Sequence, residues 1–305
     1  MSRTTFVVGT RGSRLALRQT EIVLEPLRAA HSEVDFQVQT VRTSGDNSSA
    51  SLAEIGGRGV FVIELERALL AGEIDIAVHS LKDLPSEETR GLTIAAAARR
   101  EDPRDALISR LGQPLKQLPP GAALGTGSPR RAAQVTALRP DLEIRDIRGN
   151  VDTRIRKVEE GQYDAVVLAA AALARLGWLD RASEIFEPAV MLPAAGQGAL
   201  AVQVRSDDPE ANAIVRAADH AETHVAVLAE RAFERRLGGG CHAAIAALGE
   251  VTGERLRLRG LVGSADGQLL RGEMEGKTRD AEALGGRLAE QLIAQGAGAL
   301  LESAR

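Results

Sequence analysis

The junction between a strand and the helix that follows it occurs in the same form twice in this 305-residue chain. The first strand-like run ends at Gly9-Thr10-Arg11-Gly12-Ser13, and the second ends at Gly125-Thr126-Gly127-Ser128, directly before Pro129-Arg130-Arg131. Serine at the N-cap and proline at the first helical position are helix start signals. Each junction brings backbone N–H groups, the positive end of a helix and an arginine to the carboxyl end of a strand, where anions bind. The repeat predicts two α/β units, each with an anion site.

Strand and helix patterns alternate around these junctions, which predicts mostly parallel sheets covered by helices. The expected strands are residues 5–9, 36–43, 74–79, 106–109, 122–125, 142–146, 163–169 and 199–204, and the clearest helices are 14–30 and 59–71. From about residue 221 the order changes to a helix, a loop, three strands and a last helix over 280–295, which is typical of a small α+β domain. We therefore expect two α/β domains around a cleft and a third, C-terminal domain. Their expected bounds are 1–98 with 199–217, 104–192, and 221–305.

Cys241 is the one cysteine of the sequence, and it follows three glycines in Leu237-Gly238-Gly239-Gly240. No intramolecular disulfide or paired-cysteine metal site can form, so any chemistry at this position is that of a lone thiolate. The glycines leave the sulfur open to attack from many directions, whereas the plain alternative is a loop thiol without a function. The neighbouring His242 is not expected to activate the thiol, because successive side chains of extended backbone point to opposite sides. The histidines show no spacing typical of metal ligands.

Arginines gather where strands are expected to end and helices to begin. These are Arg11, Arg14, Arg18, Arg130, Arg131, Arg148, Arg154 and Arg156. A guanidinium group is always charged and binds a carboxylate through paired hydrogen bonds, so the cleft is expected to bind a ligand with several carboxylates or phosphates. A nucleotide is disfavoured because the sequence contains neither a Walker motif nor a GxGxxG fingerprint. The alternative is a solvated surface arginine, which we expect for Arg28, Arg110, Arg216 and Arg287.

A predicted strand runs through His79 and delivers Lys82 and Asp83 to the edge where the arginines gather. A carboxylate there can accept a proton or stabilise a developing cation, and both Lys82 and partial burial would tune its pKa. The alternative for Asp83 is a surface salt bridge or a turn residue. His79 is expected to be a packed core side chain rather than a base.

Charge and composition exclude two classes of partner. The net charge is -4 and aromatic residues make up 2% of the chain, which leaves neither a basic field nor enough rings for stacking on bases. No apolar run approaches the ~20 residues that span a bilayer, and residues 1–8 run into a strand pattern without the apolar core of a signal peptide. We therefore expect no nucleic-acid partner, no membrane partner and a cytoplasmic location.

Seven motifs follow one another along nearly the whole chain. They are Thr10-Arg11 with Ser13, Ala77-Val78-His79-Ser80-Leu81-Lys82-Asp83, Glu101-Asp102-Pro103-Arg104-Asp105, Gly125-Thr126 with Ser128 and Arg130-Arg131, Arg148-Gly149-Asn150-Val151 with Thr153-Arg154, Leu192-Pro193 with Gly196-Gln197-Gly198, and Gly239-Gly240-Cys241. Together they closely resemble the porphobilinogen deaminase family, also called hydroxymethylbilane synthases. The resemblance implies three domains, of which the first two are similar to periplasmic binding proteins. It also implies a monomeric transferase of tetrapyrrole (haem) biosynthesis.

The resemblance further implies a covalent dipyrromethane cofactor, linked to Cys241 through a thioether. Four porphobilinogen molecules would be joined to it with loss of ammonia, and linear hydroxymethylbilane would then be released by hydrolysis. Asp83 would bind the pyrrole N–H groups and act as acid and base. The residues implied to hold the cofactor are Lys82, Asp83, Thr126, Ser128, Arg130 and Arg131, and those implied to hold the acetate and propionate groups of the substrate are Arg11, Ser13, Arg148, Arg154 and Gln197.

Two sites depart from the family pattern. Glu54 and Arg58 lie where lysine is frequent, in the polar segment 44–59 that we expect to form a mobile flap over the cleft, and His242-Ala243-Ala244 replaces a polar residue followed by Val-Pro. Without the resemblance, the cleft would also suit a non-catalytic binding protein or sensor for a polyanion. That alternative explains neither the glycine-cysteine loop nor the third domain. A third alternative, a thiol acyl-transferase that uses Cys241, lacks a placed base.

Overall fold

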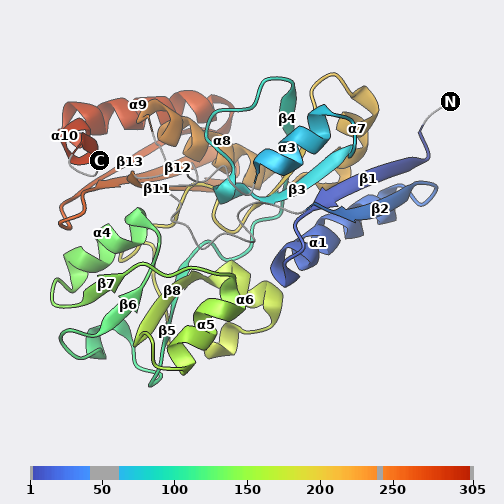
Figure 1. The fold of residues 1–305 in the computed structure, drawn as a ribbon. Helices are drawn as coiled ribbons and strands as arrows, with labels where there is room; N and C mark the ends of the chain where they lie inside the picture. The colour runs from blue at the N-terminus through green and yellow to red at the C-terminus, as the bar shows by residue number, and fades with distance from the viewer. Residues whose placement is uncertain (1–2, 42–61, 239–242, 303–305) are drawn as a thin grey trace. The chain divides into compact units, whose positions relative to one another are not determined.

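The computed structural model describes residues 3–41, 62–238 and 243–302 (Figure 1). The chain divides into two compact units. Unit 1 comprises Met1–Glu101 and Ala199–Val225, and unit 2 comprises Asp102–Gly198 and Ala226–Arg305. Unit 2 contains two separate sheets, one on each side of residue 199 in the sequence. The division into three domains with the bounds given above stays a prediction.

The sheet of unit 1 has five strands and is mixed. Its order is β2 (Asp35–Thr40), β1 (Thr5–Thr10), β3 (Ile76–Ser80), β10 (Leu200–Arg205) and β4 (Leu92–Ala98). β1 pairs in parallel with β2 and β3, whereas β10 runs antiparallel to both β3 and β4. β10 confirms that the chain returns to the first sheet after residue 199. β4 is not among the predicted strands.

Helices cover both faces of this sheet. They are α1 (Arg14–Ala30), α3 (Ile63–Leu70) and α7 (Pro209–Ile214). Val23, Leu24 and Leu27 of α1 pack in one core cluster with alternate strand residues such as Val78, whereas Leu65 and Leu69 of α3 pack in a second cluster with Ala77. Because neighbouring residues of a strand point to opposite faces, the two clusters lie on opposite sides of β3.

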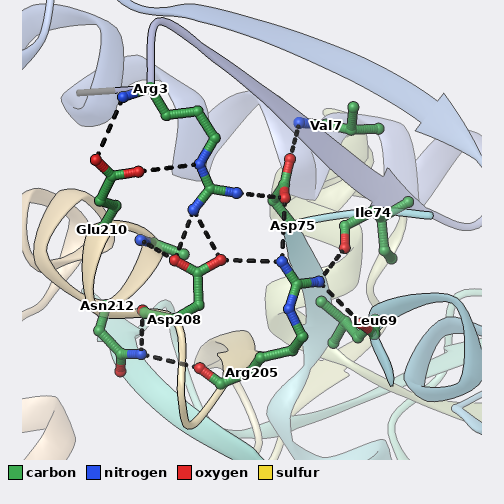
Figure 2. A network of polar contacts seen from close by, with 10 residues as sticks. Arg3, Val7, Leu69, Ile74, Asp75, Arg205, Asp208, Glu210 and Asn212 are labelled. Carbon is green, nitrogen blue, oxygen red and sulfur yellow. Dashed lines mark hydrogen bonds and ion pairs between the residues drawn. The ribbon is translucent and has the colours of Figure 1, made fainter. Parts of the chain in front are cut away.

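A cluster of paired charged side chains lies at the end of the sheet where β1 begins (Figure 2). Asp208 accepts hydrogen bonds from Arg3 at 2.6 and 2.7 Å and from Arg205 at 2.9 Å. Asp75, which precedes β3, accepts from Arg3 at 2.6 Å, from Arg205 at 3.2 Å and from the backbone N–H of Val7 at 2.9 Å. Two carboxylates and two guanidiniums thus hold the starts of β1 and β3 to the end of β10.

The first sheet of unit 2 repeats the plan of unit 1. Its order is β7 (Glu143–Arg145), β6 (Ala123–Gly125), β8 (Ala165–Ala169), β5 (Asp105–Ser109) and β9 (Glu184–Ile185), and its helices are α4 (Pro129–Leu138), α5 (Val151–Glu159) and α6 (Ala170–Leu176). β6 pairs in parallel with β7 and β8, and β5 is antiparallel to β8. Val135 of α4 packs in one cluster, and Ile155 of α5 packs with Leu173 of α6 in another. Helices again cover both faces.

The second sheet of unit 2 is a three-stranded antiparallel meander. Its strands are β11 (Ala244–Thr252), β12 (Arg255–Gly263) and β13 (Leu269–Lys277), and the helices of this part are α8 (Ala221–Arg236), α9 (Ala281–Ala294) and α10 (Ala297–Glu302). Phe233 of α8 packs on Gly260, where an added Cβ would lie 2.5 Å from the ring. The predicted fold class, two α/β sheets followed by a small α+β domain, is confirmed. None of the described helices combines the length and apolarity needed to cross a membrane.

Candidate functional site

The carboxyl edge of the unit 1 sheet brings together the site residues predicted for that unit. β1 and β3 are parallel neighbours, with Gly9 opposite Ala77, so the residues that follow the two strands meet at one edge. Arg11 and Ser13 follow β1. Lys82 and Asp83 follow β3 in a single 3₁₀ turn, Leu81–Asp83, whose N–H at Leu81 donates to the carbonyl of Ala199 at 3.1 Å. Leu81 itself is buried and anchors the turn.

The carboxylate of Asp83 lies at this edge and has no hydrogen-bond or ion-pair partner among the described residues. Its side chain is partly exposed, and within the described part of the chain it accepts no hydrogen bond and forms no ion pair. The surface salt bridge considered as its alternative is therefore not formed with any described residue. A carboxylate in this state can accept a hydrogen bond or a proton from a ligand.

Two buried polar side chains, Gln19 and His79, lie next to the turn in the sequence or in space. Gln19 of α1 is buried, and its side-chain nitrogen donates to Oγ of Ser80 at 3.0 Å. His79 is buried as well. Burial lowers the pKa of His79 to about 4; a hydrogen bond with Gln203 opposes this, and the charge of Arg11 adds to it. His79 is therefore neutral at physiological pH, and the prediction of a packed histidine is confirmed.

The loop Thr126–Ser128 holds the corresponding edge in unit 2. Ser128 is the N-cap of α4: its Oγ accepts from the backbone N–H of Arg131 at 3.5 Å, and Pro129 occupies the first turn. Oγ of Ser13 caps α1 in the same way, accepting from the N–H of Ala16 at 3.2 Å. Both predicted caps are confirmed. A side chain at Gly127 would place its Cβ 2.8 Å from the Asp146 carboxylate, so a larger residue here would require the Asp146 side chain to move.

Arg130 and Arg131 are buried and already hold a carboxylate of the protein. Nη1 of Arg130 donates to Oδ2 of Asp105 at 2.6 Å, and Nε and Nη2 of Arg131 donate to Oδ1 at 3.0 and 2.8 Å. Burial raises the pKa of Asp105, but the charges and hydrogen bonds of the two arginines outweigh it and hold this pKa far below its usual value. The sequence motif contains Asp105, yet no role for it follows from the sequence. One feature of the sequence hints at a role for Asp105: it is an aspartate at the first residue of a strand that is otherwise mainly apolar. Elsewhere in the chain, the adjacent Arg130 and Arg131 need a negative charge if they are buried.

Gln197 lies in the same network rather than at the surface. It is fully buried, and its side-chain nitrogen donates to the carbonyl of Pro103 at 2.7 Å and to Oδ1 of Asp105 at 3.0 Å. In the structure, Gln197 is therefore bonded to Asp105, the same carboxylate that Arg130 and Arg131 bind. Its contact with substrate stays a prediction.

Arg148 and Arg154 flank the start of α5. Nε of Arg148 donates to Asp146 at 2.8 Å, and Nε of Arg154 donates to the carbonyl of Gly149 at 2.7 Å. Gly149 has a φ of +108°, a conformation that other residues rarely adopt. Both arginines are partly exposed, in contrast to Arg130 and Arg131. Arg28, Arg110, Arg216 and Arg287 are exposed, as predicted.

Several predicted positions lie outside the described residues. They are Cys241, His242, Glu54, Arg58 and the expected flap, residues 44–59. Within the described ranges, no group of three or more histidine, aspartate and glutamate side chains is placed to hold a metal ion.

Comparisons with known proteins cover almost the entire chain. The family model described as porphobilinogen deaminase, dipyromethane cofactor binding domain, matches residues 6–213, and the model of the C-terminal domain of the same family matches residues 224–294. The porphobilinogen deaminase of Roseiflexus sp. (strain RS-1) is 49% identical over 298 residues, or 97% of this chain and 98% of that protein. The porphobilinogen deaminase of Desulforudis audaxviator is 50% identical over 305 residues, or 99% of each.

Among solved structures, the methionine-binding protein MetQ aligns with 78% of this chain and 97% of its own, with a TM-score of 0.46 and 14% identity. The sequence relationships extend over both units and the small third sheet at close to half of all positions. The chain therefore belongs to the porphobilinogen deaminase family.

Proposed function

We propose that this protein is a transferase that makes linear hydroxymethylbilane from porphobilinogen. It joins four porphobilinogen molecules, with loss of ammonia at each step, to a covalent dipyrromethane primer, and it releases the tetrapyrrole by hydrolysis. The observation that carries the proposal is the carboxylate of Asp83, which forms no hydrogen bond or ion pair with any described residue and follows Lys82 at the edge shared with Arg11. The match of both family models along the chain supports the same conclusion.

The described residues fit a dipyrromethane. Each pyrrole of the cofactor brings two carboxylates, so the group needs cations and N–H donors in excess of the protein's own carboxylates. In unit 2, Arg130 and Arg131 lie with Asp105 at the start of α4, where the helix N-terminus also favours anions. In unit 1, Lys82 and Arg11 follow neighbouring strands and lie at the edge of the sheet. The donor set has the sign of charge that such a ligand requires.

The residues that would hold the cofactor are Lys82, Asp83, Thr126, Ser128, Arg130 and Arg131, and the covalent link would be a thioether at Cys241. When bound, the dipyrromethane supplies the pyrrole carbon to which the first substrate is joined. Thr126 has a structural role in addition, because its Oγ1 accepts from the backbone N–H of Ser128 at 3.2 Å and so shapes the loop.

Asp83 is the acid and base of the proposed reaction. Its carboxylate accepts a hydrogen bond from the pyrrole N–H of the substrate and offsets the positive charge that develops on the ring as ammonia leaves. It then accepts the proton that is lost when the new carbon–carbon bond is complete, and as an acid it returns this proton to the amine that leaves in the next addition. A group placed in this way typically contributes ~10² to 10⁴ in rate. His79, in the strand before this turn, is neutral and adds no competing charge.

The acetate and propionate groups of the substrate are held by Arg11, Ser13, Arg148 and Arg154 in this proposal, with Gln197 as a further contact. Arg148 and Arg154 support the assignment because both are partly exposed at the carboxyl edge of the unit 2 sheet. A guanidinium binds a carboxylate through two parallel hydrogen bonds, which fixes the orientation of the bound ring.

The remaining properties are inferences of different origin. We infer a cytoplasmic monomer, as the family resemblance implies. We infer no nucleic-acid partner, because the net charge is -4 and aromatic residues are scarce, and no membrane partner, because no apolar run approaches the ~20 residues that span a bilayer. Sedimentation of the purified protein tests the oligomeric state.

Turnover of porphobilinogen tests the proposal directly. Purified protein is incubated with porphobilinogen, and both free ammonia and linear tetrapyrrole are measured over time. The proposal predicts that ammonia and tetrapyrrole appear in a four-to-one ratio. A binding protein or sensor for a polyanion would bind porphobilinogen and return it unchanged, with no ammonia, and that result would replace the proposed activity.

A further inference from the structure

Asp105 occupies the edge of the unit 2 sheet at which the proposed cofactor residues lie. It is the first residue of β5, and because β5 is antiparallel to β8, Asp105 pairs with Ala169, the last residue of β8. The carboxyl ends of β6 and β8 are at this same edge. Asp105 is fully buried, with an exposed fraction of 0%.

Both oxygens of Asp105 accept hydrogen bonds from its neighbours. Oδ2 accepts from Nη1 of Arg130 at 2.6 Å, while Oδ1 accepts from Nε and Nη2 of Arg131 at 3.0 and 2.8 Å and from Gln197 at 3.0 Å. Each guanidinium has a second anchor, since Nη1 of Arg130 also donates to the carbonyl of Leu192 at 2.8 Å. Nη1 of Arg131 donates to the carbonyl of Val167 at 2.8 Å. The planes of both arginines are thus fixed by Asp105 together with one backbone carbonyl each.

The carboxylate also sets the charge of the arginine pair. Two adjacent guanidiniums with exposed fractions of 3% and 6% would repel each other strongly in a medium of low dielectric constant. One buried carboxylate between them offsets part of this positive charge. Burying such a group is costly unless it is hydrogen-bonded, and both oxygens of Asp105 accept hydrogen bonds here.

Gln197 connects this centre to the chain that leaves unit 2. The segment from Leu192 to Gly198 ends at the boundary between the units, and β10 of unit 1 begins directly after it. The carbonyl of Leu192 accepts from Arg130, and the side chain of Gln197 donates to Asp105. The arginine pair and this segment are therefore held by one carboxylate.

We propose that Asp105 is the positioning residue of the cofactor site: it fixes the orientation and the net charge of Arg130 and Arg131 and ties both to the Leu192–Gly198 segment. This inference rests on the proposed function. Asp105 touches neither cofactor nor substrate. It acts through the two arginines, which take up carboxylates in the correct geometry only while Asp105 holds them.

The test measures cofactor loading, separately from turnover. Apoprotein is produced in cells that cannot make porphobilinogen and is then incubated with porphobilinogen, and the gain in mass of the denatured chain is followed with time. Asp105→Asn keeps the shape of the side chain but removes its charge. We expect it to load at least ~10-fold more slowly than wild type, because both arginines lose their ionic partner.

Asp75→Asn is the matched control. Asp75 also lies between two arginines, Arg3 and Arg205 (Figure 2). It directly precedes β3, whereas Lys82 and Asp83 follow β3, so it lies at the end of the unit 1 sheet away from the predicted site residues. The Asp75→Asn variant should have a lower melting temperature and an unchanged loading rate below that temperature. A purely structural role for Asp105 would give the same pattern as Asp75→Asn, a loss of stability with normal loading, and would overturn the inference.

If Asp105→Asn does not fold, Asp105→Glu tests the positioning role instead. It keeps the charge but moves the carboxylate by one methylene, so loading should again be at least ~10-fold slower. Loading at the wild-type rate by either folded variant would contradict the positioning role. Wild-type apoprotein that gains no mass would refute the proposed function itself, and this inference with it.

Discussion

The carboxylate of Glu230 accepts a hydrogen bond from the backbone N–H of Gly196, with 2.6 Å between Oε2 and N. Its other oxygen, Oε1, accepts from the backbone N–H of Gly249 in β11 at 2.7 Å, and the side chain is fully buried. One residue of α8 therefore fixes both the segment that follows Leu192 and the middle of a strand in the small sheet. Burying a carboxylate is costly unless it is hydrogen-bonded. The two buried N–H groups likewise need an acceptor, so removal of the Glu230 side chain should leave both without one.

Replacement of Glu230 by alanine should destabilise the protein strongly. Two buried N–H groups would lose their acceptor at about 1 to 3 kcal/mol each, so the free energy of unfolding should fall by about 2 to 6 kcal/mol in urea titrations. Glu290→Ala is the control, because Glu290 is exposed and pairs with Arg236 at 3.2 Å across the surface. The control should change stability by less than ~1 kcal/mol. Equal losses in the two variants would show that Glu230 has no special role.

Removal of Asp208 should flatten the dependence of stability on pH. Burial raises the pKa of Asp208, but hydrogen bonds from Arg3 and the N–H of Ala211, together with the charge of Arg205, outweigh it and hold the pKa below 3.8. A carboxyl whose pKa is lowered by folding stabilises the protein fully above its unfolded-state pKa, and this stabilisation is lost as the pH falls through the folded-state pKa. Wild-type protein should therefore lose more stability than Asp208→Asn as the pH falls below about 4.

Two features make this comparison clean. Asparagine is as good an N-cap as aspartate, so α7 keeps its cap on the N–H of Ala211. Glu210→Gln serves as the control in the same cluster, because Glu210 is nearly half exposed and lies 3.4 Å from Arg3. Unfolding should be followed by circular dichroism across this pH range. A slope for Asp208→Asn as steep as that of Glu210→Gln would mean that the cluster in Figure 2 does not couple folding to protons.

Asp83→Asn should abolish turnover while the protein still folds. The amide can accept the hydrogen bond of a pyrrole N–H, but it takes up no proton and offsets no positive charge, so kcat should fall by at least ~10² to 10⁴. Stopped-time assays of tetrapyrrole formation measure this, and the melting temperature checks the fold. Glu87→Gln, at an exposed position in the following loop, should keep normal kcat. Near-normal kcat for the Asp83 variant would remove Asp83 from the mechanism.

The local parts of the fold could be predicted because their causes lie within a few residues. Ser13 and Ser128 cap helices through bonds to residues three positions on, so the pattern alone reveals them. β4 could not be predicted in this way. Its sequence, Leu92–Ala98, ends in four alanines, which favour strands weakly, and its partner β10 lies more than a hundred residues away, with a register shift between Val202 and Gln203.

The candidate site was predictable in its residue types but not in its bonds. Position at a strand end and excess positive charge indicate that Arg130 and Arg131 serve an anion. The structure shows that their first anion is Asp105, which lies 25 residues from Arg130 in the sequence and meets it only through the order of the sheet. Gln197 illustrates the same limit, because its burial and its bond to Asp105 depend on long-range packing. No local pattern contains that information.

The mass of the purified, denatured protein tests the central claim most directly. A thioether to a pyrrole methylene survives both denaturation and thiol reductants, so protein from normal cells should be heavier than the bare chain by two linked pyrrole units. The added mass should map to the peptide that contains Cys241. Cys241→Ser should lack it and should form no tetrapyrrole, since a serine hydroxyl is a far weaker nucleophile than a thiolate. Folded wild-type protein with the mass of the bare chain, and ligand affinity that Cys241→Ser retains, would contradict the account and indicate a binding protein instead.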